Sequence, residues 1–371
     1  MTLPAATLDH VVINARDDMD RAADVYRRLG FTLTERGYHS LGSMNHLAMF
    51  GTDYLELIAV PKNATSGRLD LLQFPFGLNG LVFGSEDSAV TYDALSKAGV
   101  PVEPPVEFTR PVKYSGGQGD ARFRTVRMKN GVVPYGRVYY CHHFTRDLVW
   151  RDEWRHHANG TVAVARAIIV EPDPAKGAKL YADMFGADNV RPIRDGMTVV
   201  VGNSRFDIMT ELALKNEFGR SVPDAEGRKA YMAGLTFRTT SLGKAGKALE
   251  AGGVLVALSA DHAVAPFPEL HFPGTDPMRG RVDPMPPITA LKKAIVAKGG
   301  DSTAVDILSG IILMDRQKVA AIGINADSAI TALQKALLAI PGMLNGEILS
   351  LPVFSIVGLA GGLYLLRQAS R

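Results

Sequence analysis

Cysteine, tryptophan and an excess of either charge are all scarce in this chain. Its 371 residues include one cysteine, Cys141, which excludes an internal disulfide framework and a cysteine-rich zinc module. Lys and Arg (41) nearly balance Asp and Glu (38), so the sequence does not indicate a nucleic-acid partner. The opening MTLPAATLDHVVIN lacks the charged start and long apolar run of a signal peptide. We therefore expect a cytoplasmic protein.

Four segments repeat one pattern: a short apolar strand, a polar turn, an amphipathic helix, then glycine and an apolar residue. They close at Gly30, Gly99, Gly186 and Gly253, at intervals of 69, 87 and 67 residues. A long interval between two shorter ones indicates two pairs of modules. Alternating apolar runs after each helix give the order β-α-β-β-β, and modules must pair because one such unit leaves a sheet face uncovered. The sequence predicts an α+β fold of four βαβββ modules forming two paired, cupped sheets.

The predicted boundaries follow from this repeat and from composition. The first paired domain covers residues 1–155 and the second 156–275, followed by a proline-rich linker at 276–287 and a mainly helical extension at 288–371. Residues 348–366 carry no charge and reach membrane-spanning length, but Pro352 and three glycines disfavour an isolated helix. A buried helix or a homo-oligomer contact is the preferred interpretation, and membrane association through 348–366 is the alternative.

The concave face of a paired sheet is a natural ligand cavity, and strand alternation indicates which side chains face it. Val11, Ile13, Leu55 and Leu57 should pack on the helices. Alternation then sends six other residues toward the cavity: His10, Val12, Asn14, Tyr54, Glu56 and Ile58. An imidazole and a carboxylate on one concave surface suit a divalent metal ion. We take Tyr54 and Asn14 as candidate substrate-binding residues.

The second module adds Cys141, His142 and His143 in its last strand. Counting from the preceding glycine matches Glu56 to Cys141, which turns Cys141 and His143 inward and His142 outward. A one-residue bulge would reverse this, so both histidines are candidates. We interpret Cys141 as a buried thiol rather than a nucleophile, because no helix N-terminus is evident beside it.

Three further polar residues could serve the same cavity. His46 lies beside the Glu56 strand and is a candidate general base, or else a cross-strand polar residue. Arg122 and Arg124 share a strand face and could clamp an anionic substrate; the alternative is solvated charge.

The four-module pattern, with LDHVVIN at its start, the NHLAMFGTDYLELI hairpin and CHHFTRDLVW at the end of the second module, resembles the glyoxalase-like branch of the vicinal oxygen chelate superfamily. The resemblance covers about residues 7–275. It implies an enzyme that chelates a small molecule through adjacent oxygens on a divalent metal (iron, manganese, zinc or nickel). By position it implies the ligands His10 and Glu56, with His143 or His142, and Glu56 or His46 would move the proton.

The sequence departs from that pattern in two places. Gly80 stands where His10 stands in the first module, so one expected ligand is missing. In the second pair, Arg166 and Asp207 occupy the positions of His10 and Glu56, so that half is expected to be a structural companion without metal. The leading hypothesis is a metal-dependent lyase, isomerase or dioxygenase. The alternatives are a metal-free protein that sequesters a small molecule in the same cavity, and an oligomerising or membrane-associated adaptor.

Overall fold

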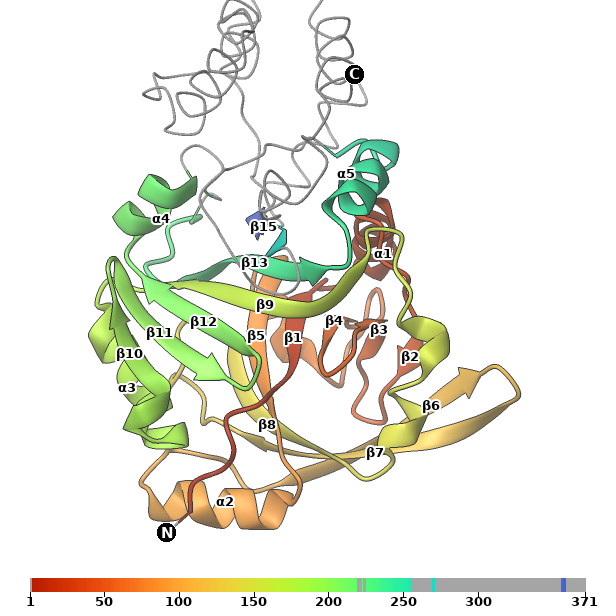
Figure 1. The fold of residues 1–371 in the computed structure, drawn as a ribbon. Helices are drawn as coiled ribbons and strands as arrows, with labels where there is room; N and C mark the ends of the chain where they lie inside the picture. The colour runs from red at the N-terminus through yellow and green to blue at the C-terminus, as the bar shows by residue number, and fades with distance from the viewer. Residues whose placement is uncertain (1, 219–221, 223–224, 255–268, 271–354, 358–371) are drawn as a thin grey trace, which may run out of the picture. The chain divides into compact units, whose positions relative to one another are not determined.

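The computed structural model describes residues 2–218, 222, 225–254, 269–270 and 355–357 (Figure 1). The predicted linker at 276–287 lies outside this set, as does the extension at 288–371 apart from residues 355–357. Among the described residues, no helix has the length and apolar character needed to cross a membrane. The predictions made for residues 348–366 therefore fall almost wholly outside the described part of the chain.

The first two modules form one eight-stranded sheet. The first module contains β1 (Leu8–Asn14), α1 (Met19–Arg28), β2 (Gly37–Tyr38), β3 (Met44–Met49) and β4 (Tyr54–Ala59). The second contains β5 (Gly77–Gly84), α2 (Ser88–Lys97), β6 (Val106–Tyr114), β7 (Gly117–Arg127) and β8 (Arg137–His143). The strand order is β2-β3-β4-β1-β5-β8-β7-β6. In each module the last strand runs parallel to the first, and β1 and β5 pair antiparallel, which confirms the predicted pairing of modules.

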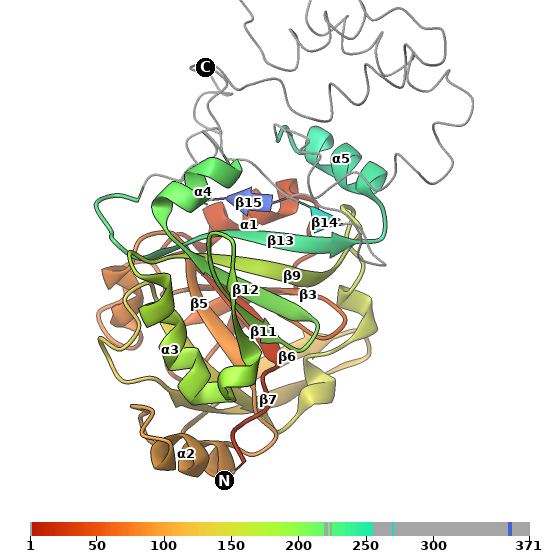
Figure 2. The same cartoon turned by 60° about the vertical axis from the view of Figure 1, so that its left-hand side comes forward.

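The second half builds a second sheet in the same way. The third module contains β9 (Thr161–Val170), α3 (Pro174–Phe185), β10 (Val190–Ile193), β11 (Gly196–Val201) and β12 (Ser204–Met209), followed by α4 (Glu211–Phe218). The fourth is described through β13 (Tyr231–Thr239) and α5 (Leu242–Ala251). The order is β10-β11-β12-β9-β13, and the short strands β14 (Glu269–Leu270) and β15 (Ser355–Val357) both pair antiparallel with β13. Figure 2 shows α3 lying along this sheet, against β10, β11 and β12.

One hydrophobic core joins the two sheets. The predicted helix-side residues of the first sheet all belong to it: Val11, Ile13, Leu55 and Leu57. Residues of the second half complete this core. Phe83 of β5 packs with a ring-centroid distance of 4.8 Å on Phe185 of α3, and Phe31 packs at 5.4 Å on Phe237 of β13. The second half therefore covers the helix side of the first sheet, and the opposite concave face carries the candidate site.

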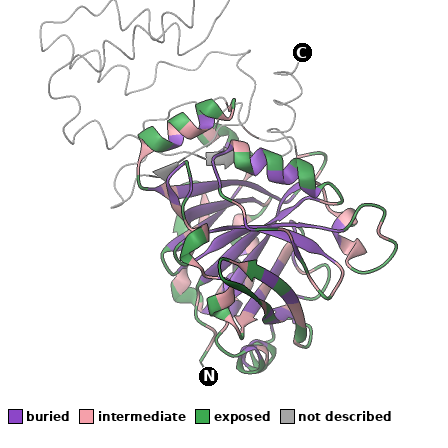
Figure 3. Cartoon of the chain, turned by 90° about the vertical axis from the view of Figure 1, so that its right-hand side faces the viewer, coloured by how far each residue is buried: buried purple, intermediate pink, exposed green. Residues whose placement is uncertain are grey.

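The four module helices α1, α2, α3 and α5 form where the repeat predicts them. In α1, Asp18 caps the N-terminus by accepting a hydrogen bond from the Arg21 N–H, and the buried residues Met19, Ala22, Ala23 and Tyr26 share one face. Figure 3 shows this alternation, with buried and exposed stripes along the helices and largely buried strands. Gly30, Gly99, Gly186 and Gly253 all have positive φ, so each closing glycine takes a backbone conformation that other residues rarely adopt.

Candidate active site

The concave face of the first sheet carries a second apolar cluster. Val12 of β1, Tyr54 and Ile58 of β4, and Cys141 of β8 belong to it, so these strands face the way alternation predicts. Trp150 and Tyr139 pack against the same cluster. We call this face, with the side chains that line it, the first cup.

His10 and Glu56 meet in the first cup. His10 Nε2 lies 3.5 Å from Glu56 Oε2 and 3.2 Å from the Tyr139 hydroxyl oxygen. The Asn45 amide donates to Glu56 Oε1 at 2.8 Å. The Tyr54 ring stacks on the imidazole at a centroid distance of 4.4 Å, with 16° between the planes. The imidazole is therefore fixed in plane and position by its neighbours.

A carboxylate that sequence analysis missed lies on the other side of this imidazole. Asp9 Oδ1 accepts a hydrogen bond from His10 Nδ1 at 2.6 Å and another from His143 Nε2 at 3.1 Å. Strict alternation would put Asp9 and His10 on opposite faces, but the pairing of β1 with β5 shifts register between Leu8 and His10. Such a bulge turns neighbouring side chains to one face.

Electrostatics fix the protonation of this group. Burial disfavours a charged imidazole, but hydrogen bonds to Asp9 and Glu56 and their charges outweigh it and raise the pKa of His10 to about 9. Burial likewise disfavours the Glu56 carboxylate, yet the hydrogen bond and charge of His10 lower its pKa to about 2. At neutral pH the first cup therefore holds an imidazolium between two carboxylates, all less than a tenth exposed.

The last strand of the second module presents its three candidates as predicted by counting. Cys141 packs in the cup, and the His143 ring lies 4.9 Å from the Trp150 ring and 6.5 Å from the Tyr54 ring. His142 faces the other way, where the Ser88 N–H at the start of α2 donates to its Nδ1 at 3.3 Å. His142 is therefore not brought to the cup.

The predicted metal ligands do not converge as a set. Nδ1 of His10 lies 2.6 Å from Asp9 Oδ1, whereas its Nε2 faces Glu56, so the two ring nitrogens point to different carboxylates. A different group among the described residues, Asp9, Cys141 and His143, brings three donor atoms within 4.8 Å of one another. A carboxylate, a thiol and an imidazole are ligand types that zinc accepts. His143 Nδ1 is buried with no hydrogen-bond partner in the described part of the chain. These residues fit a divalent ion.

The vacant ligand position at Gly80 has a steric cause. A Cβ at this residue would lie 2.7 Å from the carbonyl oxygen of Arg137, its partner on the neighbouring parallel strand. A ligand side chain would require the two strands to separate. The first cup is therefore asymmetric, with His10 and Asp9 on β1 and no counterpart on β5.

Four other predicted site residues lie away from the imidazole. His46 points to the helix side, where its Nδ1 contacts the Thr34 carbonyl oxygen at 2.7 Å. Arg122 and Arg124 share a face, as expected, but both pair with Glu107 at 2.8 Å on the exposed side of β7. Asn14 is buried, and its amide donates to three backbone carbonyls of the segment 71–75. Asn14 thus holds the loop after η1 (Leu69–Gln73) and offers the cup no free amide hydrogen.

The second sheet carries an ion pair at the equivalent place. In the first half Val12 pairs with Glu56, and in the second Ile168 pairs with Asp207, so His10 and Arg166 occupy matching registers. Arg166 Nε lies 2.5 Å from Asp207 Oδ2, and its terminal nitrogens pair with Glu217 of α4. A guanidinium between two carboxylates occupies the place that imidazolium takes in the first cup.

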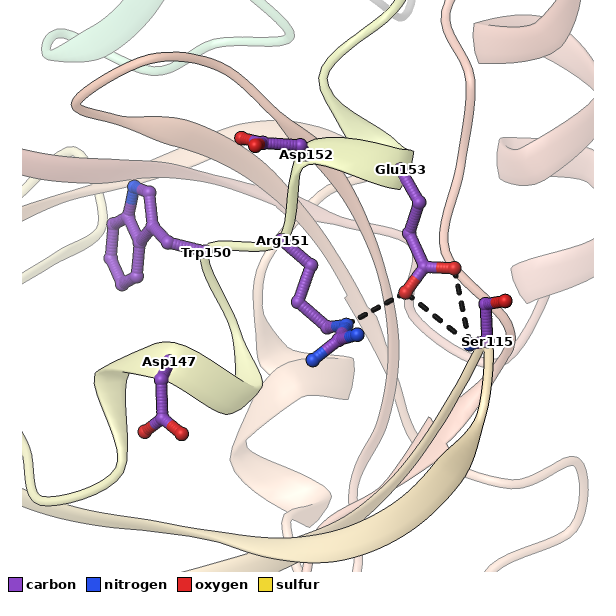
Figure 4. Close-up of a pocket in the computed structure, with 6 residues that line it drawn as sticks. All are labelled: Ser115, Asp147, Trp150, Arg151, Asp152 and Glu153. Carbon is purple, nitrogen blue, oxygen red and sulfur yellow. Dashed lines mark hydrogen bonds and ion pairs between the residues drawn. The ribbon is translucent and has the colours of Figure 1, made fainter.

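A cavity of about 420 Å³ lies beside the first cup, along η2 (Arg146–Leu148) and η3 (Asp152–Trp154). Figure 4 shows its lining: Ser115, Asp147, Trp150, Arg151, Asp152 and Glu153. Glu153 accepts hydrogen bonds from the Arg151 side chain and the Ser115 N–H. Trp150 lines this cavity and also contacts His143, so its ring separates the cavity from the buried histidine.

Two βαβββ modules joined in one cupped sheet, with polar side chains from the first and last strands on the concave face, define the vicinal oxygen chelate fold. Residues 8–185 match the family model described as "Glyoxalase-like domain". This stretch, just under half of the chain, is therefore similar to the glyoxalase-like domains of the vicinal oxygen chelate superfamily.

Other comparisons give weaker likenesses. A comparison with curated proteins finds no match. A hypothetical protein from Staphylococcus aureus aligns at 16% identity and a TM-score of 0.45, covering 55% of this chain and 86% of that one. A mutant of 4-hydroxymandelate synthase from Streptomyces coelicolor aligns at 14% identity and a TM-score of 0.44, covering 70% of this chain and 78% of that one. Methylmalonyl-CoA epimerase from Streptomyces coelicolor aligns at 19% identity and a TM-score of 0.28, covering 37% of this chain and 94% of that one. At TM-scores below 0.5, none of these likenesses bears on the activity of this chain.

Proposed function

We propose that the chain is an enzyme of the vicinal oxygen chelate type that acts on a small oxygen-rich molecule in the first cup, with a divalent metal ion held by Asp9, Cys141 and His143. The observation that carries the proposal is the convergence of these three donors beside a buried imidazolium–carboxylate pair. The metal position differs from the set expected from sequence, since His10 serves the Asp9 carboxylate instead of the ion.

The residues around the ligands support this assignment. His10 donates to Asp9, and such outer hydrogen bonds commonly orient a ligating carboxylate. Burial is the main cause that raises the pKa of the Cys141 thiol, and the charges of Asp9 and Glu56 add to it, so Cys141 stays protonated without a cation. A nearby cation stabilises the thiolate, so metal binding at this site would release a proton.

The proton chemistry falls to His10. Its Nε2 carries a proton at neutral pH and faces both Glu56 and the Tyr139 hydroxyl, so it can donate to a substrate oxygen placed against it. General acid catalysis of this kind contributes typically about 10²–10⁴-fold. A divalent ion bound next to it would supply Lewis-acid polarisation of the substrate oxygens.

The test is a Co²⁺ titration of the purified full chain, followed by absorption. Because the chain has one cysteine, any thiolate-to-cobalt band belongs to Cys141. We expect one Co²⁺ per chain with such a band, loss of the band in Cys141→Ser, and clearly weaker binding in His143→Gln. His142→Gln is the matched control, since it changes the adjacent histidine on the opposite face. Absence of the band in the wild-type chain, or equal losses in both histidine variants, would refute the metal assignment.

A second function, metal-free sequestration of a small molecule, is favoured by the ion pair at the equivalent position of the second half. Arg166 and Asp207 cannot form a metal centre together, yet they keep the register of His10 and Glu56. If the wild-type chain binds no Co²⁺ and still binds small oxygen-rich anions after chelator treatment, this second function is the correct one.

A further inference from the structure

The first cup carries more arginine than its carboxylates balance. Arg127 at the end of β7 is the cross-strand partner of Tyr139 on β8, and Arg137 lies two residues before Tyr139 on the same face. Arg68, just before η1, donates to both Asp70 carboxylate oxygens, at 2.8 and 2.7 Å. Asp70 Oδ2 also lies 3.9 Å from Arg137 Nη1. Arg68 and Arg137 thus share one carboxylate, and the Arg127 charge also acts on Asp70.

These groups are removed from water without full pairing. The side chains of Arg68 and Arg137 are 16% exposed. Arg127 is half-buried and donates through Nε to Thr125 at 3.2 Å, but its terminal nitrogens have no hydrogen-bond partner among the described residues. Burial, and then the charge of Arg68, lower the pKa of Arg137 to about 10. Arg68 pairs with Asp70, and Arg137 donates to the Asn79 side-chain oxygen at 3.2 and 3.0 Å. The terminal nitrogens of Arg127 are left for a bound anion, and such an anion would offset the cost of gathering three half-buried positive charges.

The arginines lie between solvent and the buried chemistry. Arg68, Arg127, Arg137 and Tyr139 are partly exposed, whereas His10 and Glu56 are buried. The Tyr139 hydroxyl is 3.2 Å from His10 Nε2. An anion bound to Arg127 and Arg137 would therefore lie one side chain from the proposed proton donor.

We propose that Arg68, Arg127 and Arg137 form a subsite for an oxyanion, a carboxylate or phosphate group carried by the molecule that enters the first cup. Planar guanidinium groups pair with such oxyanions through two parallel hydrogen bonds. The proposal rests on the proposed function only in treating the cup as a substrate site, because binding of the anion itself requires neither metal nor turnover.

The experiment is calorimetric titration of the chelator-treated full chain with malonate and, separately, with inorganic phosphate. We expect saturable binding of one anion per chain, and the tighter of the two probes identifies the preferred group. Arg127→Gln should weaken binding about 10-fold or more, since a hydrogen bond to a charged group contributes roughly 1.5–3 kcal/mol. Arg124→Gln, on the same strand but on its exposed face, is the matched control and should bind as the wild type does.

Three results would overturn the subsite. The first is the absence of saturable binding of either probe by the wild-type chain, and the second is an equal loss in the Arg127→Gln and Arg124→Gln variants. Arg127→Lys keeps the charge, so its affinity for the anion should lie between those of the wild type and Arg127→Gln. Equal affinity of the Lys and Gln variants is the third result that would overturn the subsite. The Co²⁺ titration separates the two proposals: anion binding without Co²⁺ binding refutes only the metal site, and Co²⁺ binding without anion binding refutes only the subsite.

Discussion

His157 gives a pH-dependent stability that can be measured without knowing the substrate. Its Nδ1 accepts a hydrogen bond from the Thr32 N–H at 3.0 Å, and its Nε2 donates to the Met49 carbonyl at 2.8 Å. Its ring lies between Phe31 and Phe50, at centroid distances of 5.6 and 5.1 Å. This environment suits neutral imidazole, because a second proton would break the bond from Thr32 and place a charge among aromatic rings.

The sign and size of the effect follow from linkage. Burial lowers the pKa of His157 to about 4, against 6.5 in the unfolded chain. The unfolded state therefore binds more protons between these pH values, and stability is complete above pH 6.5 and lost as pH falls toward 4. The two pKa values give a loss of about 2 kcal/mol between pH 7.5 and pH 5, approaching roughly 3 kcal/mol below pH 4.

The assay is urea denaturation followed by tryptophan fluorescence at pH 7.5 and pH 5. The chain has two tryptophans, Trp150 and Trp154, and both are among the described residues, so the fluorescence signal reports on this part of the chain. His157→Gln should lose stability at pH 7.5, and its loss on acidification should be smaller than that of the wild type by about 2 kcal/mol. His156→Gln, its exposed neighbour, should keep that loss. An acid-induced loss in His157→Gln as large as in the wild type would refute the reasoning.

Three further predictions concern stability. Burial raises the pKa of Asp53 to about 7, so the folded state binds more protons than the unfolded state between pH 3.8 and 7. Asp53→Asn should therefore raise the free energy of unfolding at pH 8 by up to roughly 4 kcal/mol. At pH 4 the same variant should leave the free energy of unfolding nearly unchanged. A Cβ at Gly252 would lie 1.8 Å from a backbone carbonyl oxygen of α1, whereas one at Gly246 meets nothing within 4 Å; thermal melts should show Gly252→Ala destabilised and Gly246→Ala stabilised by about 0.5–1 kcal/mol. Denaturation of Arg166→Gln should show a loss of about 3 kcal/mol, because it removes the buried guanidinium and leaves Asp207 with only the longer contact to Arg205. Arg122→Gln should cost less than about 1 kcal/mol.

Periodicity carried the fold prediction because the repeat is a property of single segments. The helix-side residues of β1 and β4 and the closing glycines all follow from spacing that one segment contains. The same rule placed Tyr54, Glu56, Cys141 and His143 on one face. Periodicity cannot predict a local irregularity that interrupts strand alternation, and the register shift beside Asp9 is such an irregularity. Sequence alternation assigns Asp9 to the helix side, although it binds both cup histidines.

Long-range packing explains the other differences. His46 and Arg122 lie on strands that the sequence identifies, but which face meets solvent depends on how β3 and β7 pair with their neighbours. The arginines of the cup come from three separate segments, and only the fold brings them around Tyr139. The one segment that suggested an anion clamp from sequence, with Arg122 and Arg124, turns that pair toward Glu107 on the exposed face.

The two halves of the chain provide an internal comparison of what the first cup can do. Both place a cation on the first strand and a carboxylate in the same register on the last strand of a module. In the second half the cation is a guanidinium, which holds its proton at any physiological pH and closes the site by pairing with α4. In the first half the cation is the imidazolium of His10, which can give up a proton. Its Nδ1 faces the Asp9 carboxylate, which His143 also contacts. Because both halves keep an ion pair in this register, the imidazole and Asp9 are the differences that favour a chemical site in the first half and a structural one in the second.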